Sequence, residues 1–442
     1  MEKFMETDIK HTEINREPGD LLVIKFGGKA LGDSSRIQKL AHKTAELFEI
    51  RPILVVVSAM GDETNRLIRL ADGVSGGDCH PKDLIEIVAH GEILSTSVFT
   101  TALRALGYNA EAINPASKYW PIIARSKGQI KLAREKINQN VDIEILEDIS
   151  RSKAMEGIGS LLKNGVIPVV CGFLALSEDG ELLTLGRGGS DTSAFLLAKL
   201  LGASEVIIVT DVKGLLKADP SKVKSTEQVH YISVDEIDSV MKSGGQVLHP
   251  QSLTYKTDKM KARIVHFEEE SYEDTGTEIV GFYKARLKGI QKKLAMVTLV
   301  GENLSENHSL WKEIGGLISG ISATLFGLSF TESFICFYID ESGSDELYTM
   351  LNEFAKAKPS LKNVIQRKGV ARLNLTSHDN AESPEVLAGI FEILSERGIS
   401  VIEVITNHSD VSVFVDWADR KEASRIFKRL ATDMNLKEVL GG

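Results

Sequence analysis

The chain has 442 residues, of which 43% are hydrophobic and 26% are charged, which predicts two to four globular domains and excludes a collagen-like, low-complexity or disordered chain. The formal net charge of −10 argues against a nucleic-acid partner, which needs a basic face. The three cysteines, Cys79, Cys171 and Cys336, are widely spaced and indicate neither a disulfide framework nor a zinc site. The sequence contains no apolar run of about 18 residues, the length that a membrane span needs, so we expect a cytoplasmic protein with no membrane partner.

A polar leader comes first along the chain. Residues 1–20 lack the apolar centre of a secretory signal, and we expect them to form a flexible arm. Strands and helices then alternate up to residue 283, which predicts an α/β domain with a mostly parallel sheet sandwiched by helices. The predicted strands are residues 21–26, 53–57, 166–171 and 206–209, and the predicted helices are residues 34–50, 84–106, 143–164 and 192–201.

The pattern of elements changes after residue 283. Residues 284–294 are basic and predict a linker or a linker helix. A β-α-β pattern then occurs twice, about 70–75 residues apart, which predicts two small α+β units of the ferredoxin-like kind. We place them at residues 295–365 and 366–442; one compact C-terminal domain is the alternative. The predicted strands are residues 295–300, 322–326, 333–339, 369–376, 400–406 and 411–415, and the predicted helices are residues 308–319, 384–397 and 420–433.

The strongest local signal is a glycine-rich segment at residues 185–194. Its closely spaced glycines let the backbone approach a ligand, and the helix that follows offers its N-terminal amides to an anion. Arg187 can hold a carboxylate with two hydrogen bonds. Ser190 or Asp191 could alternatively be a plain N-cap, although a cap requires neither Arg187 nor so many glycines.

A second candidate site follows the first strand. Lys25, Gly27 and Gly28 stand at the end of this strand and before a helix. That arrangement suits a phosphate held by an ammonium group and by backbone amides. The spacing is not that of a Walker A loop, and a double-glycine turn with an exposed lysine is an equal alternative.

Two further candidates adjoin the second strand and the helix after it. Residues 58–65, which include Thr64, follow a buried strand, where open α/β sheets bind ligands; a turn with a capping hydroxyl is the alternative. Glu92 follows a glycine within a predicted helix. A lone acidic residue in such a position is ordinarily solvated surface.

The last candidates follow the strand at residues 206–209. Thr210, Asp211 and Gly214 can bond a base, a ribose or a phosphate, and residues 244–250 form another glycine turn. Since parallel strands end at one edge of a sheet, these cations, glycines and acids are expected to converge. The combination favours transfer of a phosphoryl group to a small charged acceptor.

In this order the motifs resemble those of aspartate kinases, which are members of the amino acid kinase family. Such enzymes carry KFGG, SAM followed by TN, GE, TLGRGGSD, TDVxG with ADP, and a glycine-rich VLHP segment, and then two ACT domains. All of these motifs occur here, in that order, from residue 21 toward the C-terminus. TLGRGGSD is highly specific, whereas KFGG alone is not.

The resemblance implies an activity. ATP would phosphorylate the side-chain carboxylate of L-aspartate, with Mg²⁺ accompanying the nucleotide, as the first step toward lysine, threonine and methionine. A free aspartate side chain has a pKa of about 3.9, so the nucleophile is already ionised and needs no general base. The resemblance also implies a homodimer or higher homo-oligomer, with ACT domains that bind an amino-acid effector such as lysine or threonine.

The resemblance further implies roles for the matching residues. Lys25, Arg187 and Asp191 would be catalytic, with Lys25 at the transferring phosphate and Arg187 at the α-carboxylate of aspartate. The aspartate site would comprise Thr64, Glu92, Arg187, Ser190 and Asp191, with Glu92 near the amino group. The nucleotide site would comprise Lys25, Gly27, Gly28, Thr210, Asp211, Gly214 and Gln246.

Some positions depart from the pattern of that family. Lys29 and Ala30 stand where Thr-Ser is usual, Gln246 replaces a lysine expected near the nucleotide phosphates, and Ser221 replaces an arginine after ADP. The departures leave two alternatives open: a kinase of another small amino acid, and a catalytically weak paralogue that senses amino acids. The retained cationic and acidic site residues favour an active aspartate kinase.

Overall fold

The structure is a computed structural model and describes residues 20–126, 143–218, 222–223, 225–242, 248–282, 286–289, 292–376, 384–407 and 410–428. The chain divides into two compact units, Met1–Tyr283 and Lys284–Gly442, and each is considered by itself. The expected leader, apart from Asp20, and the site residue Gln246 lie outside the described residues, as does Ser221. Of the helices that the structure describes, none is long and apolar enough to cross a bilayer.

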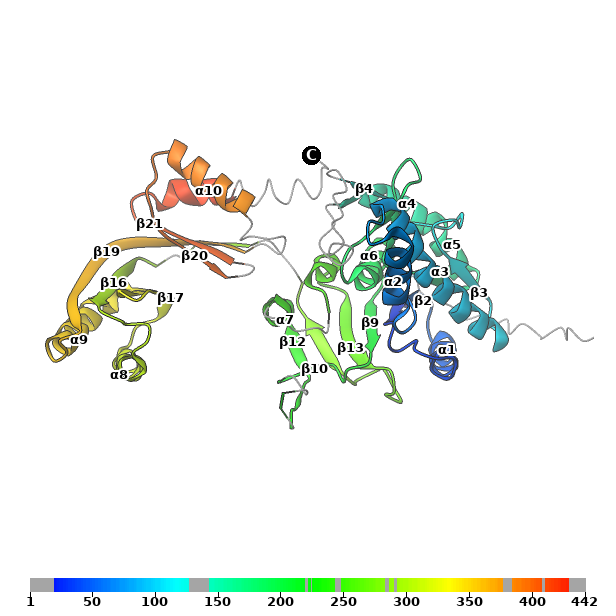
Figure 1. The fold of residues 1–442 in the computed structure, drawn as a ribbon, viewed down its shortest axis with the longest axis horizontal. Coiled ribbons are helices and arrows are strands. Elements are labelled where there is room, and N and C mark those ends of the chain that lie inside the picture. The colour runs from blue at the N-terminus through cyan, green and yellow to red at the C-terminus, as the bar shows by residue number, and fades with distance from the viewer. Residues whose placement is uncertain are drawn as a thin grey trace, which may run out of the picture. The chain divides into compact units, whose positions relative to one another are not determined.

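An eight-stranded sheet lies at the centre of the first unit (Figure 1). Its order is β12-β14-β13-β9-β1-β2-β6-β3, and all neighbours run parallel except β13 and β14. Strands β1, β2 and β6 are buried throughout, as their continuous aliphatic runs predict. The bounds are β1 (Leu22–Phe26), β2 (Ile53–Val57), β3 (Ala110–Ile113), β6 (Ile167–Cys171), β9 (Glu205–Thr210), β12 (Tyr231–Ser233), β13 (Lys261–His266) and β14 (Thr277–Val280).

Helices cover both faces of this sheet, because alternate residues of each strand point to opposite sides. In β1, Val23 packs into a core with α4, α5 and α6, whereas Leu22 and Ile24 pack into a second core with α1 and α3. The α/β class predicted from the sequence is therefore confirmed. The helices are α1 (Ser34–Phe48), α2 (Glu63–Ser75), α3 (Pro81–Ala105), α4 (Glu147–Glu156), α5 (Ile158–Lys163), α6 (Gly189–Leu201) and α7 (Val234–Lys242).

The single helix predicted at residues 143–164 is wrong. The segment begins with β5 (Ile143–Ile145), which pairs antiparallel with β4 (Ala124–Ser126). The helical part is then divided at Gly157 into α4 and α5. A Cβ atom on Gly157 would lie 3.3 Å from the Cα atom and 3.3 Å from the carbonyl oxygen of Tyr119, which belongs to another segment. Close backbone packing, which periodicity does not reveal, therefore sets this break.

The second unit is built on a seven-stranded antiparallel sheet, which together with its helices gives the α+β part of the predicted fold class. The prediction of a linker helix after residue 283 is wrong, because β15 forms there and pairs with the end of β19. The strands are β15 (Arg286–Gly289), β16 (Leu294–Gly301), β17 (Leu325–Phe330), β18 (Phe334–Asp340), β19 (Leu361–Thr376), β20 (Val401–Asn407) and β21 (Asp410–Asp416).

Strand β19 serves both halves of this sheet. Its 16 residues pair with β16 from Leu361 to Val370 and with β21 from Val370 to Thr376. The boundary expected between residues 365 and 366 thus falls inside a continuous strand. The helices of this unit are α8 (His308–Ser319), α9 (Ser344–Lys356) and α10 (Pro384–Glu396), followed by a helical stretch at residues 420–428. One apolar core lies under α8 and α9, and another lies under α10 and residues 420–428.

An aromatic pair shows that the sheet is strongly curved. The rings of Tyr338 in β18 and Phe414 in β21 stack with centroids 3.7 Å apart, although β16 and β19 lie between these strands in the sheet order. Four adjacent strands in a flat sheet would span about 14 Å, so the sheet must bend to bring the two rings together. The Tyr338 hydroxyl donates to a Glu403 carboxylate oxygen at 2.5 Å.

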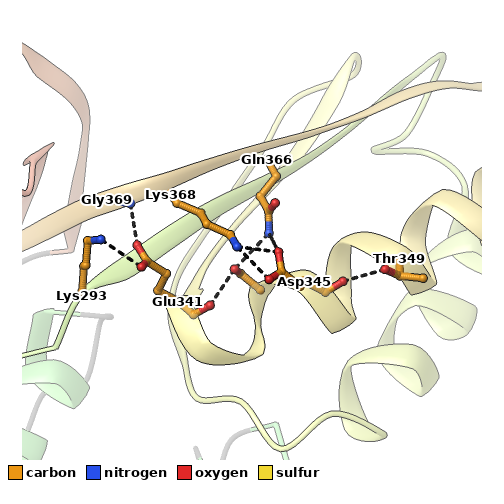
Figure 2. Close-up of polar contacts among 8 residues, drawn as sticks. Lys293, Glu341, Asp345, Thr349, Gln366, Lys368 and Gly369 are labelled. Atoms are coloured by element: carbon orange, nitrogen blue, oxygen red, sulfur yellow. Dashed lines mark hydrogen bonds and ion pairs between the residues drawn. The ribbon is translucent and has the colours of Figure 1, made fainter.

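Carboxylates attach the start of α9 to the sheet (Figure 2). Glu341 accepts from the Lys293 ammonium at 3.0 Å and from the Gly369 amide at 2.8 Å. Asp345 in the first turn of α9 accepts from Lys368 at 2.7 Å. Negative charge at a helix N-terminus is favourable, so the same groups stabilise the helix and fix it to β19.

Candidate active site

Three neighbouring strands of the first sheet end side by side, and the turns after them form the candidate site. The turns follow β1, β2 and β6, and together with α2, α3 and α6 they enclose a cavity of about 320 Å³. This position is the one expected for ligands in open parallel sheets. The lining comprises Lys25, Gly28, Lys29, Ser58, Ala59, Gly61, Thr64, Val88, Glu92, Phe173, Gly186, Arg187, Gly188, Gly189, Ser190 and Asp191.

A buried ion pair lies in this cavity. Lys25 shares the β1 face of Val23, the side covered by α6. Its ammonium nitrogen lies 2.6 Å from the Asp191 Oδ1 atom of α6, and each side chain is 11% exposed. Removing two charges from water is costly unless they pair closely, so the pair fixes both side chains at the cavity wall.

The glycine-rich segment forms the N-terminus of α6. Gly188 is the N-cap and adopts a left-handed φ of 69°, with no side-chain cap. Ser190 and Asp191 lie inside the helix, so the alternative in which either is a plain N-cap is wrong. A Cβ atom on Gly188 would overlap His249, and one on Gly189 would lie 2.8 Å from the Phe173 ring. These glycines are therefore required by close packing beneath the loop, as well as by its conformation.

His249 lies directly beneath this loop. Burial lowers the pKa of His249, the Arg187 charge lowers it further, and Asp191 opposes the change only in part. The imidazole is therefore neutral near pH 7 and serves as a packing surface for Gly188 rather than as an added cation.

The carboxyl group of Glu92 is buried in the cavity wall. Desolvation raises the pKa of Glu92 to about 8, and the opposing effects of a hydrogen bond to the Ala59 backbone and of the Lys25 charge are smaller. The Oε2 atom is buried without a hydrogen-bond partner among the described residues. The expectation of a solvated surface residue is therefore wrong, and the carboxyl group is available to a ligand in the cavity.

Thr64 and Arg187 line the same cavity. Thr64 belongs to the first turn of α2 and is half-buried. Arg187 is exposed, in the loop before α6. The cavity thus brings together residues predicted from widely separated motifs: Lys25, Gly28, Thr64, Glu92, Arg187, Ser190 and Asp191. Gly27 is adjacent, since a Cβ atom there would lie 3.6 Å from the Lys25 ammonium.

The residues predicted for the nucleotide lie beside this cavity, after β9. Asp211 accepts from the Lys29 ammonium at 2.9 Å and from the Thr210 hydroxyl at 3.2 Å. Although burial alone would raise the pKa of Asp211, the hydrogen bond and charge of Lys29 lower it below its ordinary value. Gly214 has a φ of 72°, and a Cβ atom on it would lie 2.5 Å from the Thr277 hydroxyl oxygen. Gly214 is therefore needed for the conformation and close packing of this turn.

Two cavity residues were missed as site residues by the sequence analysis. Lys29 was treated as a departure from a motif and as an added cation that could substitute for the missing hydroxyl or alter the preferred acceptor, and it lines the cavity. Phe173 has a left-handed φ of 69°, which is uncommon for a non-glycine residue, and its amide donates to the Ser193 hydroxyl at 3.1 Å. The only available signal for Phe173 was its position just after a predicted strand.

The acidic residues of the site are dispersed rather than clustered. Within the described ranges, no three His, Cys, Asp or Glu residues come together as a metal site. Asp191 and Asp211 each present a carboxylate next to a lysine. Mg²⁺ usually keeps several waters and binds one or two carboxylates together with substrate phosphates, and the dispersed carboxylates fit an ion that arrives with a nucleotide.

Comparisons with known proteins cover most of the chain. The sequence model described as "Amino acid kinase family" matches residues 20–266. Aspartokinase 2 of Bacillus subtilis (strain 168) is 28% identical over 410 residues, which cover 91% of this chain and 95% of the relative. The aspartokinase of Geobacillus stearothermophilus is 28% identical over 408 residues, with coverage of 90% and 93%.

Solved structures show the same fold. A crystal structure of aspartate kinase from Synechocystis superposes with a TM-score of 0.69 at 24% identity and covers 92% of this chain and 69% of the other. E. coli aspartokinase III in complex with aspartate and ADP superposes with a TM-score of 0.52 at 20% identity, with coverage of 92% and 98%.

Proposed function

Since the chain belongs to the amino acid kinase family, we propose that it is an aspartate kinase that uses ATP to phosphorylate the side-chain carboxylate of L-aspartate. The resemblance to aspartate kinases drawn from the motifs is confirmed by the relatives, and the protein is a phosphotransferase. The choice of acceptor rests on one observation: Lys25 of β1, Glu92 of α3, and Arg187 and Asp191 at the start of α6 line a single cavity at the strand ends.

The cavity supplies a partner for the α-carboxylate and for the ammonium group of aspartate. In this proposal Arg187 holds the α-carboxylate with two hydrogen bonds, and Glu92 receives the ammonium group. Thr64 and Ser190 complete the contacts from α2 and α6. A ligand with one ammonium and two carboxylates fits this set of groups, and the solved E. coli relative is described as a complex with aspartate and ADP.

The reaction needs positioning and charge neutralisation more than proton transfer. The acceptor carboxylate is ionised at pH 7, so its oxygen can attack the γ-phosphorus of ATP directly while the bond to the β-phosphate oxygen breaks. Lys25 stabilises the transferring group in this proposal, Gly27 and Gly28 line its path, and the close pairing with Asp191 orients the Lys25 side chain. Mg²⁺ enters with ATP and neutralises part of the phosphate charge.

The nucleotide is assigned to the neighbouring turns. Thr210 ends β9, Asp211 and Gly214 follow it, and Asp211 pairs with the cavity residue Lys29. We assign these residues to the ATP site together with Gln246, whose assignment rests on its motif alone. The strand order supports this choice, because β9 pairs with β1, which carries Lys25. ATP and aspartate would then meet near the β1 turn.

Regulation belongs to the second unit in this proposal. Its α+β architecture is of the kind expected for ACT domains, and we propose that it binds an amino-acid effector, lysine or threonine, in a homodimer or larger homo-oligomer in the cytoplasm. The product would serve biosynthesis of lysine, threonine and methionine. Titration of each amino acid into the kinase assay tests this part separately from the activity itself.

One assay tests the proposed activity directly. Purified protein is incubated with ATP, Mg²⁺, hydroxylamine and a panel of amino acids, and acyl phosphate is trapped as the hydroxamate. Product with aspartate alone supports an aspartate kinase, and product with another amino acid replaces the proposed acceptor. If no amino acid gives product but lysine or threonine binds saturably, the protein is a sensor instead.

A further inference from the structure

An ion pair connects the turns after two adjacent strands. The Lys29 ammonium lies 2.9 Å from Asp211 Oδ2, and Lys29 lines the cavity. Lys29 belongs to the turn after β1, and Asp211 directly follows β9, which pairs with β1 in parallel register. The pair therefore spans the ends of the two strands at the border between the cavity and the proposed nucleotide residues.

The backbone that carries Lys29 is held by hydrogen bonds, while its side chain is largely exposed. The Lys29 carbonyl accepts from the Arg36 guanidinium at 2.8 Å, and the Ala30 amide donates to the Gly27 carbonyl at 3.0 Å. The Lys29 side chain is 75% exposed, and its four-carbon stem is flexible. The ammonium group can therefore exchange partners without movement of the turn.

The charges in the cavity leave a need for a further cation. Lys25 is already paired with Asp191, and Arg187 is assigned to the acceptor carboxylate. Ala30 is buried in the core and has no hydroxyl to offer a phosphate. Two anionic substrates must nevertheless meet here, and closely spaced like charges repel strongly outside bulk water. Among the described lining residues, Lys29 is the cation best placed between them.

We propose that Lys29 is a further phosphate-binding residue, which leaves Asp211 and contacts the terminal phosphates of ATP when the nucleotide binds. The inference deepens the proposed function and rests on it. An exposed ion pair contributes little to stability, so the exchange of a carboxylate for a more highly charged phosphate is favourable. Asp211 holds the ammonium near the phosphate path until then.

Nucleotide binding tests the inference without relying on turnover. Calorimetry compares a non-hydrolysable ATP analogue with adenosine, each with Mg²⁺, for the wild type and for Lys29→Ala, Lys29→Arg and Lys82→Ala. Lys82 is a matched control, because it is also an exposed lysine, paired with Glu181 at 2.7 Å, but does not line the cavity. We expect Lys29→Ala to weaken the analogue about tenfold, as for a lost charged hydrogen bond, and to leave adenosine unchanged.

The remaining variants separate a phosphate contact from a structural role. Lys29→Arg should restore most of the analogue affinity, and Lys82→Ala should match the wild type. Equal loss of analogue and adenosine affinity in Lys29→Ala, or no loss of either, overturns the inference. An increase only in the KM for the acceptor also overturns it. A wild type that binds nucleotide without phosphorylating aspartate overturns the proposed function alone, and one that binds no nucleotide overturns both.

Discussion

Lys25 is a buried side chain whose ammonium nitrogen pairs closely with the Asp191 carboxylate. Its position on β1 and its 2.6 Å pairing with Asp191 make it a fixed positive charge beside the proposed phosphate path. Fixed charges of this kind in a water-poor site stabilise developing negative charge far more than mobile ones do. The side chain is therefore suited to act in the transition state rather than in initial binding.

We predict that Lys25→Ala lowers kcat by on the order of 10²–10³. The physical reason is the loss of a positioned charge at the transferring phosphate. Steady-state kinetics of hydroxamate formation provide the measurement, and a thermal melt checks that the variant remains folded. A folded variant with near-normal kcat would remove Lys25 from the proposed catalytic role.

Glu92 predicts a pH dependence of aspartate binding. Burial raises the pKa of Glu92 to about 8, so the carboxyl group is mostly protonated at pH 7 and must ionise to bind the ammonium of aspartate. Affinity for aspartate should therefore fall as pH is lowered from 8 to 6, by up to about tenfold per unit. Binding of aspartate in the presence of a non-hydrolysable ATP analogue, measured across this range, checks the slope.

Glu92→Gln supplies the control for that prediction. The amide cannot ionise, so we expect weaker binding with a flat pH profile; a slope equal to that of the wild type would assign the titration to another group. The same variant tests how Glu92 affects the stability of the folded state. Because the folded pKa is raised from 4.5 to about 8, Glu92 contributes stability below pH 4.5 that is lost as pH rises through 8. Between pH 5 and 9 the Tm of Glu92→Gln should therefore fall less than that of the wild type.

At the scale of the element, the two ends of α6 differ in what their glycines do. Gly188 at the N-terminus and Gly202 at the C-terminus have almost the same left-handed φ, 69° and 70°. A Cβ atom on Gly188 would overlap His249, whereas one on Gly202 would meet no atom within 4 Å. Alanine substitution at each of these two glycines therefore separates the cost of backbone strain from the cost of steric overlap.

We predict that Gly202→Ala costs only the strain of a left-handed residue, about 1–2 kcal/mol, and leaves kcat and both KM values unchanged. Gly188→Ala should cost more than this and should also lower kcat/KM, because His249 and the loop that carries Arg187 must move apart. Denaturant unfolding and steady-state kinetics of both variants provide the comparison. Equal effects of the two substitutions would show that the N-terminal loop of α6 tolerates rearrangement.

The sequence predicted some elements closely and missed others for identifiable reasons. The helix expected at residues 308–319 is α8, and the strand expected at residues 53–57 is β2. By contrast, α6 begins three residues before its predicted start, because glycines with low helix propensity form its first turn. The first half of β19 was missed because residues 361–368 are mostly polar and show neither a continuous apolar run nor strict alternation.

At the scale of the whole molecule, the chain consists of two compact units, Met1–Tyr283 and Lys284–Gly442. Each unit has its own sheet and its own apolar cores. The cavity that we assign to both substrates lies entirely in the first unit. We therefore expect the substrates to stabilise the first unit directly.

We predict two calorimetric unfolding transitions for the full chain, because each unit has its own core. A non-hydrolysable ATP analogue together with aspartate, at 100 times their dissociation constants, should stabilise only the first unit, by about 2.7 kcal/mol for each ligand. The transition temperature of the second unit should not change. A single transition, or an equal shift of both, would mean that the units unfold together.

The sequence by itself determined the alternation of elements, the α/β class and the motifs that place this chain in its family, because these depend on local periodicity and on the order of residues. Tertiary structure alone decided that Glu92 is buried with a raised pKa, that His249 lies under Gly188, and that Lys29 faces Asp211 across two strand ends. Desolvation, close packing and ion pairing depend on groups far apart in the chain. Distances between such groups are set only when the strands align and the helices close over them.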